Sequence, residues 1–383
     1  MTTATESNVV ILGAGYAGIG IAHKLLKHTW KKSPSFRVVL VSPSTHHFWN
    51  LASVRGLVPG EIPDGDMFRD IQSGFAKYPQ DAFAFIVGTA SGMDTSTSTV
   101  RVTTAAGTQT LHYAHLVIAT GSSYPSRIPF GIIGSYEETL DSWHSLQDSV
   151  KAAKSIIIAG SGAAGVEAAA ELGCAYGQTK QITLVMESEL PLTGLFPKVR
   201  QAAADALESL GVRLVPKARV ATSSTSQQGT LVMLSTGDTL EADLYLPFFG
   251  MRPNTQFVPS EFLDPGGSIK LNRTLRVTGS ANVWGVGDAG NLERKQLVFA
   301  EKQALRLARN LHCVLTSTEH RMGELDVDDG LKMFVTLGKK RGTGQWFGFK
   351  MPSVIVSMSK GKKFFAEKGD GLVAGKNIVR SSV

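Results

Sequence analysis

The amino-acid sequence predicts an α/β fold with two Rossmann-like domains, each built around a parallel sheet, and a small α+β domain at the C-terminus. Three observations predict this fold. A glycine-rich loop of the form G-x-G-x-x-G occurs twice, each copy lies between an apolar run and a helical pattern, and a basic segment follows from residue 331 onward. A chain of 383 residues, 43% of them hydrophobic, is long and apolar enough for two or three folded domains.

The first glycine-rich loop begins after the apolar run Val9–Leu12, which is typical of a buried parallel strand. In this motif Gly13 makes the turn, Gly15 lets a pyrophosphate approach the backbone, and Gly18 lets the helix pack closely on the strand. The helix that follows supplies N–H donors and positive potential at its start. We therefore expect a dinucleotide to bind at Gly13, Ala14, Gly15, Ala17 and Gly18.

The second loop repeats this arrangement after the apolar run Ser155–Ala159. Gly160, Gly162 and Gly165 have the same spacing, and Val166–Leu172 continues as a helix. Three glycines at this spacing arise by chance in a glycine-rich sequence, but two copies that both join a strand to a helix are specific evidence. The sequence therefore predicts a second dinucleotide site.

The strand after each loop predicts how the adenosine ribose is held. An acidic residue about 20 positions after the loop commonly accepts a hydrogen bond from the ribose. The pattern at residues 181–186 ends at Glu187, whereas the pattern at residues 36–41 ends at Ser42, which binds a hydroxyl without charge. Glu187 would repel a 2′-phosphate and no arginine occupies position 188 or 189, so we expect the second site to prefer NADH over NADPH.

Three further segments fit a protein in which one dinucleotide domain is inserted into the other. Leu116–Gly121 reads as a buried strand with a small turn where the chain leaves the first domain, and Asp243–Asn254 has the pattern of the return. In Asn282–Asp288 a carboxylate follows a strand and a flexible glycine. These segments add Ala119, Thr120, Gly121, Gly250 and Asp288 to the expected cofactor contacts.

Two stretches outside the glycine motifs, Ser42–Arg55 and Phe334–Gln345, are more distinctive. With them, nearly the whole chain resembles the apoptosis-inducing-factor-like flavoproteins, especially fungal members. This family includes the ferroptosis suppressor proteins and has type II NADH dehydrogenases as more distant relatives. The resemblance implies a disulfide-reductase-like flavoprotein fold, with FAD at the first loop and NADH (or NADPH) at the second.

The resemblance also implies roles for single residues: FAD contacts at Arg55, Val87 and Asp288, and a catalytic pair formed by Glu167 and Lys360. From the residue type alone, Arg55 suits a pyrophosphate through its planar guanidinium, but it is also typical of an ion-paired helix residue. Val87 equally fits core packing, Glu167 a carboxylate stabilised by a helix N-terminus, and Lys360 a solvated residue of a basic run.

The order of the motifs predicts the domain limits. We expect an FAD-binding domain at residues 7–123 and 251–322, an inserted NAD(P)H-binding domain at 124–250, and a basic C-terminal domain at 323–383. A helix is expected at Ala300–Leu311. Gln303 on this helix either belongs to an amphipathic core helix or lies near the second substrate.

These cofactors predict an FAD-dependent NAD(P)H:quinone oxidoreductase, in which hydride passes from NAD(P)H to the flavin and electrons pass on to a quinone-type acceptor. Cys174 and Cys313 are the only cysteines of the sequence and lie far apart along it, which excludes a relay through paired thiols. The adjacent His46 and His47 cannot both face one metal on a strand, so no metal site is expected.

Two other functions fit the same sequence. The motifs permit a flavin-dependent tailoring oxidoreductase that acts on a polyketide-like or phenolic metabolite of a secondary pathway, because a fold does not determine a function. They also permit a pro-death flavoprotein that binds nucleic acid through its basic tail. The tail lacks the interleaved aromatic and basic residues of a single-strand binder, which disfavours nucleic acid as a partner. The sequence does not predict the oligomeric state.

The basic segment at residues 331–383 contains eleven Lys or Arg against Glu367 and Asp370, whereas the whole chain carries a net charge of +7. With Phe364 and Phe365 as apolar neighbours, this segment is expected either to bring the enzyme reversibly to anionic membranes or to form a solvated basic domain.

The N-terminal sequence bears on localisation. Thr2 does not permit N-myristoylation, the first residues lack a signal-peptide pattern, and no apolar run approaches the ~20 residues needed to span a bilayer. We expect a cytoplasmic protein that can associate peripherally with a membrane, a mitochondrion or a lipid droplet, and that is not secreted.

Overall fold

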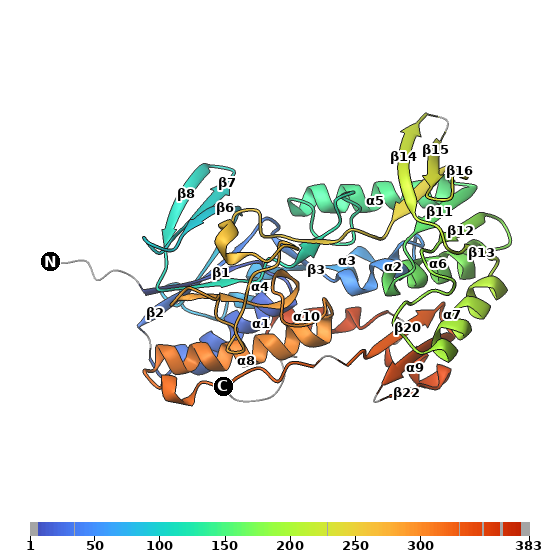
Figure 1. The fold of residues 1–383 in the computed structure, drawn as a ribbon. Coiled ribbons are helices and arrows are strands. Elements are labelled where there is room, and N and C mark those ends of the chain that lie inside the picture. Colours follow the sequence, from blue (N-terminus) through green and yellow to red (C-terminus); the bar gives the residue numbers. More distant parts are fainter. Residues whose placement is uncertain are drawn as a thin grey trace.

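The computed structural model describes residues 7–33, 35–227, 229–328, 330–346, 348–360 and 363–376. Figure 1 shows two lobes side by side, the first with the blue strands and the second with the green helices and strands. The orange and red C-terminal elements run beneath both lobes in this view.

The sheet of the first lobe has the strand order β19–β9–β1–β2–β5, and neighbouring strands are parallel. Its strands are β1 (Ser7–Leu12), β2 (Phe36–Ser42), β5 (Phe83–Val87), β9 (His115–Ile118) and β19 (Val283–Gly285). Val9, Val10 and Ile11 on the central strand β1 are fully buried. A strand covered on both faces requires a continuous apolar run, which is the pattern seen in the sequence.

Helices pack on this sheet. α1 (Tyr16–Lys24) continues into the π-helical η1 (Leu25–Trp30) and packs against α8 (Leu297–Leu315). α8 extends past both ends of the helix predicted at residues 300–311, because its apolar stripe continues through the buried Phe299 and Cys313. Smaller elements of this lobe are η2 (Asn50–Ala52), α2 (Ser53–Gly56), α3 (Asp64–Met67), α4 (Ile71–Phe75), β3 (His46–Phe48), β4 (Phe68–Asp70), β6 (Thr89–Asp94), β7 (Thr99–Thr104) and β8 (Gly107–His112).

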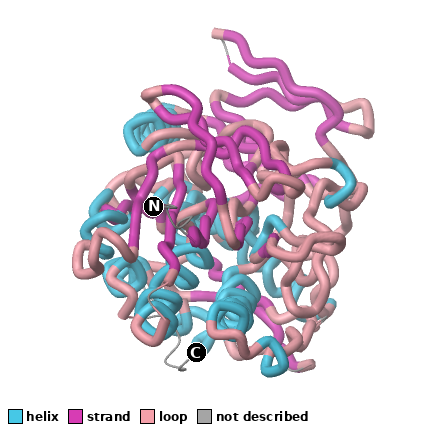
Figure 2. The backbone as a smooth tube through the Cα atoms, turned by 90° about the vertical axis from the view of Figure 1, so that its left-hand side faces the viewer, coloured by secondary structure: helices cyan, strands magenta, loops and turns pink. Residues whose placement is uncertain are grey.

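The second lobe repeats the parallel arrangement with the strand order β13–β12–β11–β17. Its elements are α5 (Tyr136–Ala152), β11 (Ser155–Ala159), α6 (Ala163–Tyr176), β12 (Gln181–Val185), α7 (Pro197–Ser209), β13 (Val212–Val215) and β17 (Leu244–Pro247). An antiparallel sheet of β14 (Val220–Ser226), β15 (Gly229–Leu234) and β16 (Thr239–Ala242) projects from the body of the lobe (Figures 1 and 2). The predicted α/β fold with two Rossmann-like domains is confirmed.

The chain passes from the first lobe to the second through β10 (Ser122–Ser123) and returns through β18 (Arg252–Pro253), and these two strands pair antiparallel. The side chain of Asn254 links the two connecting segments through hydrogen bonds. Its Nδ2 donates to the carbonyl oxygen of Thr120 at 2.9 Å, and its Oδ1 accepts from Ser123 Oγ at 2.7 Å. The crossings lie beside the domain limits predicted at 123/124 and 250/251, and the division itself remains a prediction.

The C-terminal elements form a small α+β unit. β20 (Met333–Leu337), β21 (Arg341–Trp346) and β22 (Phe349–Lys350) make an antiparallel sheet, followed by α9 (Ser353–Ser359) and α10 (Gly369–Val373). β20 packs against α6, β21 packs against α7, and α9 covers β21. The unit therefore rests on the helices of the second lobe.

After α9 the chain returns to the first lobe, where it is held by His23 of α1. His23 Nε2 donates to the carbonyl oxygen of Val373 at 2.7 Å, and Nδ1 accepts from the hydroxyl of Tyr78 at 2.9 Å. The imidazole is fully buried and stacks on Phe75, with the ring centroids 4.0 Å apart. The C-terminal segment is thus attached to both lobes.

The attachment through His23 predicts a pH dependence of stability. Burial lowers the pKa of His23 to about 3. The folded protein therefore binds this proton less readily than the unfolded chain, so the contribution of His23 is complete above about pH 6.5 and is lost as pH falls toward 3. We predict that, because of His23, the free energy of unfolding decreases by up to about 1.4 kcal/mol for each unit by which the pH falls within this window.

Urea denaturation at pH 7 and pH 5 measures this effect, and His23→Gln should show a flatter pH dependence than the wild type. The exposed His320 serves as the control, and His320→Gln should follow the wild type. Equal pH dependences for the wild type and His23→Gln would contradict the prediction.

Candidate active site

The two glycine-rich loops have nearly the same close packing. A Cβ atom on Gly13 would lie 2.4 Å from the carbonyl oxygen of Ala119, and one on Gly18 would lie 1.9 Å from the carbonyl oxygen of Gly13. The corresponding distances in the second loop are 2.6 Å for Gly160 and 1.9 Å for Gly165. Gly13 and Gly160 also have φ of +104° and +108°, in the region that favours glycine. No larger residue fits these positions without movement of the backbone.

The middle glycine of each loop faces open space instead. No atom lies within 4 Å of a Cβ built on Gly15 or on Gly162. These residues are the N-caps of α1 and α6, and neither helix start carries a side-chain cap. The first N–H groups of both helices can therefore bind an anion that approaches over the glycine, which fits the pyrophosphate of a dinucleotide.

The residues predicted to contact FAD gather at one edge of the first sheet. Ser42 ends β2, Val87 ends β5, and the two are register partners. Ala119, Thr120 and Gly121 follow β9, and Asp288 follows β19. Because the carboxyl ends of parallel strands meet at one edge, these residues lie along the same side of the sheet as the loop at Gly13 to Gly18. Their individual FAD contacts remain predictions.

Asp288 and the turn that carries it are held by hydrogen bonds from Ser122 and to Gln303. Ser122 Oγ donates to Asp288 Oδ2 at 2.8 Å, and burial raises the pKa of the Asp288 carboxyl. Gln303, expected near the second substrate, is 3% exposed. Its Oε1 accepts from the N–H of Gly287 at 2.7 Å and its Nε2 donates to Glu293 Oε2 at 2.9 Å. Gln303 thus positions the turn that carries Asp288, while its predicted contact with substrate remains untested.

The second loop has its own set of strand ends. Gly250 follows β17 with φ of +72°, and Glu187 follows β12 as an exposed carboxylate. Arg219 lies opposite, with its Nε 3.7 Å from Glu187 Oε1. These residues surround the expected position of the nicotinamide nucleotide.

The predicted catalytic pair is in direct contact. Glu167 lies on the first turns of α6, and its Oε1 accepts from Lys360 Nζ at 2.5 Å. The same oxygen accepts from the N–H of Thr336 at 2.8 Å and from its hydroxyl at 3.1 Å. Lys360 is the C-cap of α9, so this bond joins the C-terminal unit to the helix of the second glycine loop.

Arg55 is committed to a second buried ion pair one turn further along α6. Its Nη2 donates to Glu171 Oε1 at 2.7 Å and its Nε donates to Glu171 Oε2 at 3.1 Å. The guanidinium also lies 4.6 Å from the centroid of the Phe364 ring and donates to the carbonyl oxygen of Gly338 at 3.4 Å. The fork expected to hold a pyrophosphate is thus occupied by a carboxylate, and a contact of Arg55 with FAD is untested.

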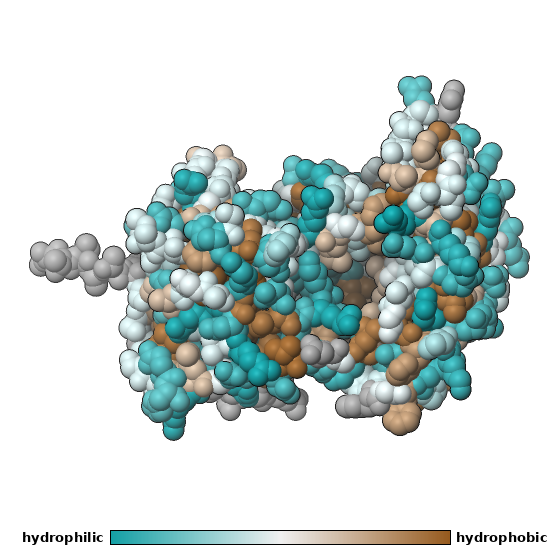
Figure 3. Space-filling model, viewed as in Figure 1, coloured by the Kyte–Doolittle hydropathy of each residue, from teal (hydrophilic) through white to brown (hydrophobic). Residues whose placement is uncertain are grey.

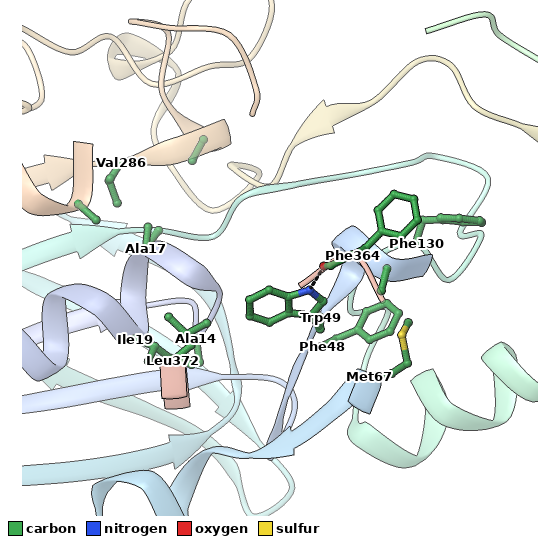
Figure 4. Packing of buried hydrophobic residues seen from close by; sticks show 14 of the residues in the cluster. Ala14, Ala17, Ile19, Phe48, Trp49, Met67, Phe130, Val286, Phe364 and Leu372 are labelled. Carbon is green, nitrogen blue, oxygen red and sulfur yellow. Dashed lines mark hydrogen bonds between the residues drawn. The ribbon is translucent and has the colours of Figure 1, made fainter. Parts of the chain in front are cut away.

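Phe364 belongs to the main buried hydrophobic core. It is fully buried, and its carbonyl oxygen accepts from Trp49 Nε1 at 2.8 Å, the dashed bond in Figure 4. Phe48, Met67 and Phe130 lie around this bond in the same view. The surface of the molecule is hollowed between the two lobes (Figure 3).

Sequence reasoning missed several residues of this site: Thr336, Ser122, Trp49 and Arg219. Thr336 contacts a residue 169 positions away, and no spacing rule links such a pair. Its only signal was its place in the distinctive stretch at residues 334–345. Among the described residues, no group of three His, Cys, Asp or Glu side chains is arranged to hold a metal ion.

The fold and its paired loops define a class, the oxidoreductases that bind two dinucleotides on two Rossmann-like domains. The chain belongs to the pyridine nucleotide-disulphide oxidoreductase family, whose model matches residues 7–306. FAD and NAD(P)H are therefore the cofactors of this chain.

Individual proteins extend the comparison. The chain is similar to oxidoreductase ptaL of Pestalotiopsis fici, with 35% identity over 94% of this chain and 96% of the relative. It is also similar to ferroptosis suppressor protein 1 of Xenopus tropicalis, with 30% identity over 94% of each chain, which confirms the family resemblance. Sulfide:quinone oxidoreductase of Aquifex aeolicus has the same fold, with a TM-score of 0.74 and 15% identity over 98% of this chain and 93% of that chain.

The pair formed by Arg55 and Glu171 leads to a prediction about stability. Removing one partner leaves an uncompensated group in the interior, which costs about 3–5 kcal/mol, whereas an apolar pair of similar volume is close to neutral. We predict this cost for Arg55→Met and recovery of most of it in Arg55→Met/Glu171→Leu. Chemical denaturation of the apoprotein measures both.

FAD content separates this role from direct binding of the cofactor. If Arg55→Met leaves the stability of the apoprotein unchanged but abolishes FAD binding, Arg55 is a cofactor contact and its structural role is contradicted.

Proposed function

We propose that this chain transfers reducing equivalents from NAD(P)H through FAD to a quinone-type acceptor. The contact between Glu167 and Lys360 is the observation that carries this proposal. The chemistry that FAD supplies when bound is acceptance of a hydride from NAD(P)H and delivery of two electrons to the acceptor. The residues of the chain orient the two nucleotides and place charge where the acceptor is reduced.

Lys360 provides the positive charge. Its side chain is 14% exposed, and its ammonium contacts Glu167 and lies 5.4 Å from the Phe364 ring centroid. A partly buried cation of this kind stabilises negative charge that develops on a nearby oxygen far better than a solvated one does. We assign Lys360 to the oxygen of the acceptor or to the flavin edge, and Glu167 to holding Lys360 in position.

The thiols of the chain favour a small-molecule acceptor. Cys174 is exposed on α6, Cys313 is buried on α8, and both are free. Electron transfer to a bound dithiol is therefore not built into the chain. The sulfide:quinone oxidoreductase, by its name, acts on a quinone.

A second candidate acceptor is a polyketide-like or phenolic metabolite. Identity is higher to oxidoreductase ptaL, at 35%, than to ferroptosis suppressor protein 1, at 30%, which favours a fungal oxidoreductase with its own substrate. Steady-state NADH oxidation with a panel of quinones and phenolic metabolites distinguishes the two. Turnover with a metabolite and none with any quinone would contradict our first proposal.

The catalytic roles predict the effects of single substitutions. Glu167→Ala and Lys360→Ala should fold and retain FAD, yet each should lower NADH:quinone turnover by roughly tenfold or more, which corresponds to a loss of ~1.4 kcal/mol of transition-state stabilisation. Lys363→Ala removes a neighbouring charge that pairs with Asp66 at 2.6 Å, and its turnover should stay near that of the wild type.

Turnover and FAD absorbance of the purified variants test these roles. Lys362, a second control from the same basic run, lies outside the described residues. If Lys360→Ala and Lys363→Ala behave alike, Lys360 belongs to the basic surface and the assignment fails.

We also propose that the enzyme binds membranes reversibly, through a different surface from that expected. Phe364 is buried, so it cannot enter a lipid phase. The exposed apolar residues are Phe349 on β22, 73% exposed, and Val354 and Met358 on α9, 64% and 74% exposed. Lys350 follows Phe349 on β22 and adds a positive charge next to this apolar side chain. Among the described residues, no helix is long and apolar enough to cross a bilayer.

Membrane association predicts that the double variant Phe349→Glu/Met358→Glu loses co-sedimentation with anionic liposomes by at least tenfold in partition coefficient. It should still oxidise NADH with a water-soluble quinone, because the side chains of Phe349 and Met358 are largely exposed to solvent. Val298→Glu, a change at an exposed apolar residue of α8, is the control and should sediment like the wild type. Sedimentation of the double variant like the wild type would reject this surface.

A further inference from the structure

Arg219 lies close to Glu187, just beyond the end of β12, and no sequence spacing predicts this contact. Lys217 turns the chain after β13 with φ of +56°, and the next N–H, that of Ala218, donates to the carbonyl oxygen of Met186 at 2.9 Å. This turn places Arg219 beside Glu187, with Arg219 Nε 3.7 Å from Glu187 Oε1. Lys217 pairs in the same way with Glu189.

This place in the fold is where a nicotinamide nucleotide presents its adenosine ribose. β12 is the strand that follows α6 and lies beside β11, and the N–H of Gly160 donates to the carbonyl oxygen of Val185 at 3.1 Å, which joins the glycine loop to the end of β12. In a Rossmann domain the side chain just beyond this strand meets the ribose 2′ position. Glu187 occupies that position, and Arg219 shares it.

We propose that Arg219 binds the 2′-phosphate of NADPH, so that this chain uses both NADH and NADPH. With NADH, Glu187 accepts from the 2′-hydroxyl and Arg219 remains beside it. With NADPH, the guanidinium turns from Glu187 to the phosphate, which its planar fork can bind through two donors.

The local electrostatics allow this exchange. Both side chains of the pair are largely exposed, and an exposed ion pair contributes little to stability, so Arg219 can leave Glu187 at little cost. The neighbouring pair of Lys217 and Glu189 adds no net charge. The 2′ site is therefore nearly neutral, and we propose use of both coenzymes in place of the preference for NADH expected from Glu187 alone.

The test measures reduction of the bound FAD without any electron acceptor. Enzyme with FAD is mixed anaerobically with NADH or with NADPH, and flavin absorbance is followed in a stopped-flow instrument as a function of coenzyme concentration. The inference rests on the proposed binding of NAD(P)H at the second loop but not on the acceptor. Reduction by both coenzymes without turnover on any quinone would contradict the proposed acceptor and leave Arg219 supported.

For the wild type we expect reduction by both coenzymes, with second-order rate constants within about tenfold of each other. Arg219→Ala should raise the half-saturating concentration of NADPH tenfold or more and change that of NADH less than threefold. Glu187→Gln should lower the half-saturating concentration of NADPH and raise that of NADH. Arg219→Lys should retain part of the NADPH affinity, because a single charge replaces the fork.

The first lobe offers a matched control. Arg273 and Glu324 form an exposed pair with an N–O distance of 3.8 Å, similar to that of Arg219 and Glu187. Arg273→Ala should leave the half-saturating concentrations of NADH and NADPH unchanged. Equal effects of Arg219→Ala on NADH and NADPH, no effect on either, or a wild type that NADPH does not reduce would each overturn the proposal.

Discussion

The structure depends on two buried carboxylates, Glu167 and Glu171, that lie one turn apart on α6. A carboxylate removed from water must be paired, and the partners here come from different parts of the chain. Lys360 arrives from the C-terminal unit and Arg55 from the first lobe. The helix that begins at the second glycine loop therefore also fixes where the other two parts of the molecule meet it, so nucleotide binding and assembly of the site share one element.

Pairing also changes what the basic C-terminal segment can do. Lys339 and Lys363 pair with Glu61 and Asp66 of the first lobe, and Lys360 pairs with Glu167. Part of the excess charge seen in the sequence is thus balanced by carboxylates elsewhere in the chain. The membrane binding that we propose consequently relies on exposed apolar side chains as well as on the remaining cations, rather than on net charge alone.

Much of the fold could be predicted because its signals are local. The apolar runs, the glycine spacing and the turns at Gly121 and Gly250 each lie within a few residues, and parallel pairing then brings their ends to common edges. The contact between Glu167 and Lys360 spans 193 residues, and only the family resemblance implies that these two residues act as a pair. The partner of Arg55, the role of Gln303 in holding Gly287 and the burial of Phe364 had no local signal, because each follows from how separate elements pack.

The repeated passage of the chain between the lobes limits how the two halves can move. β10 and β18 form one connection between the lobes. The C-terminal segment forms a second connection, because it packs on α6 and then returns to α1. Two domains joined by two separate connections resist hinge opening, since rotation about one connection strains the other. The second connection therefore restrains rotation of the second lobe about β10 and β18.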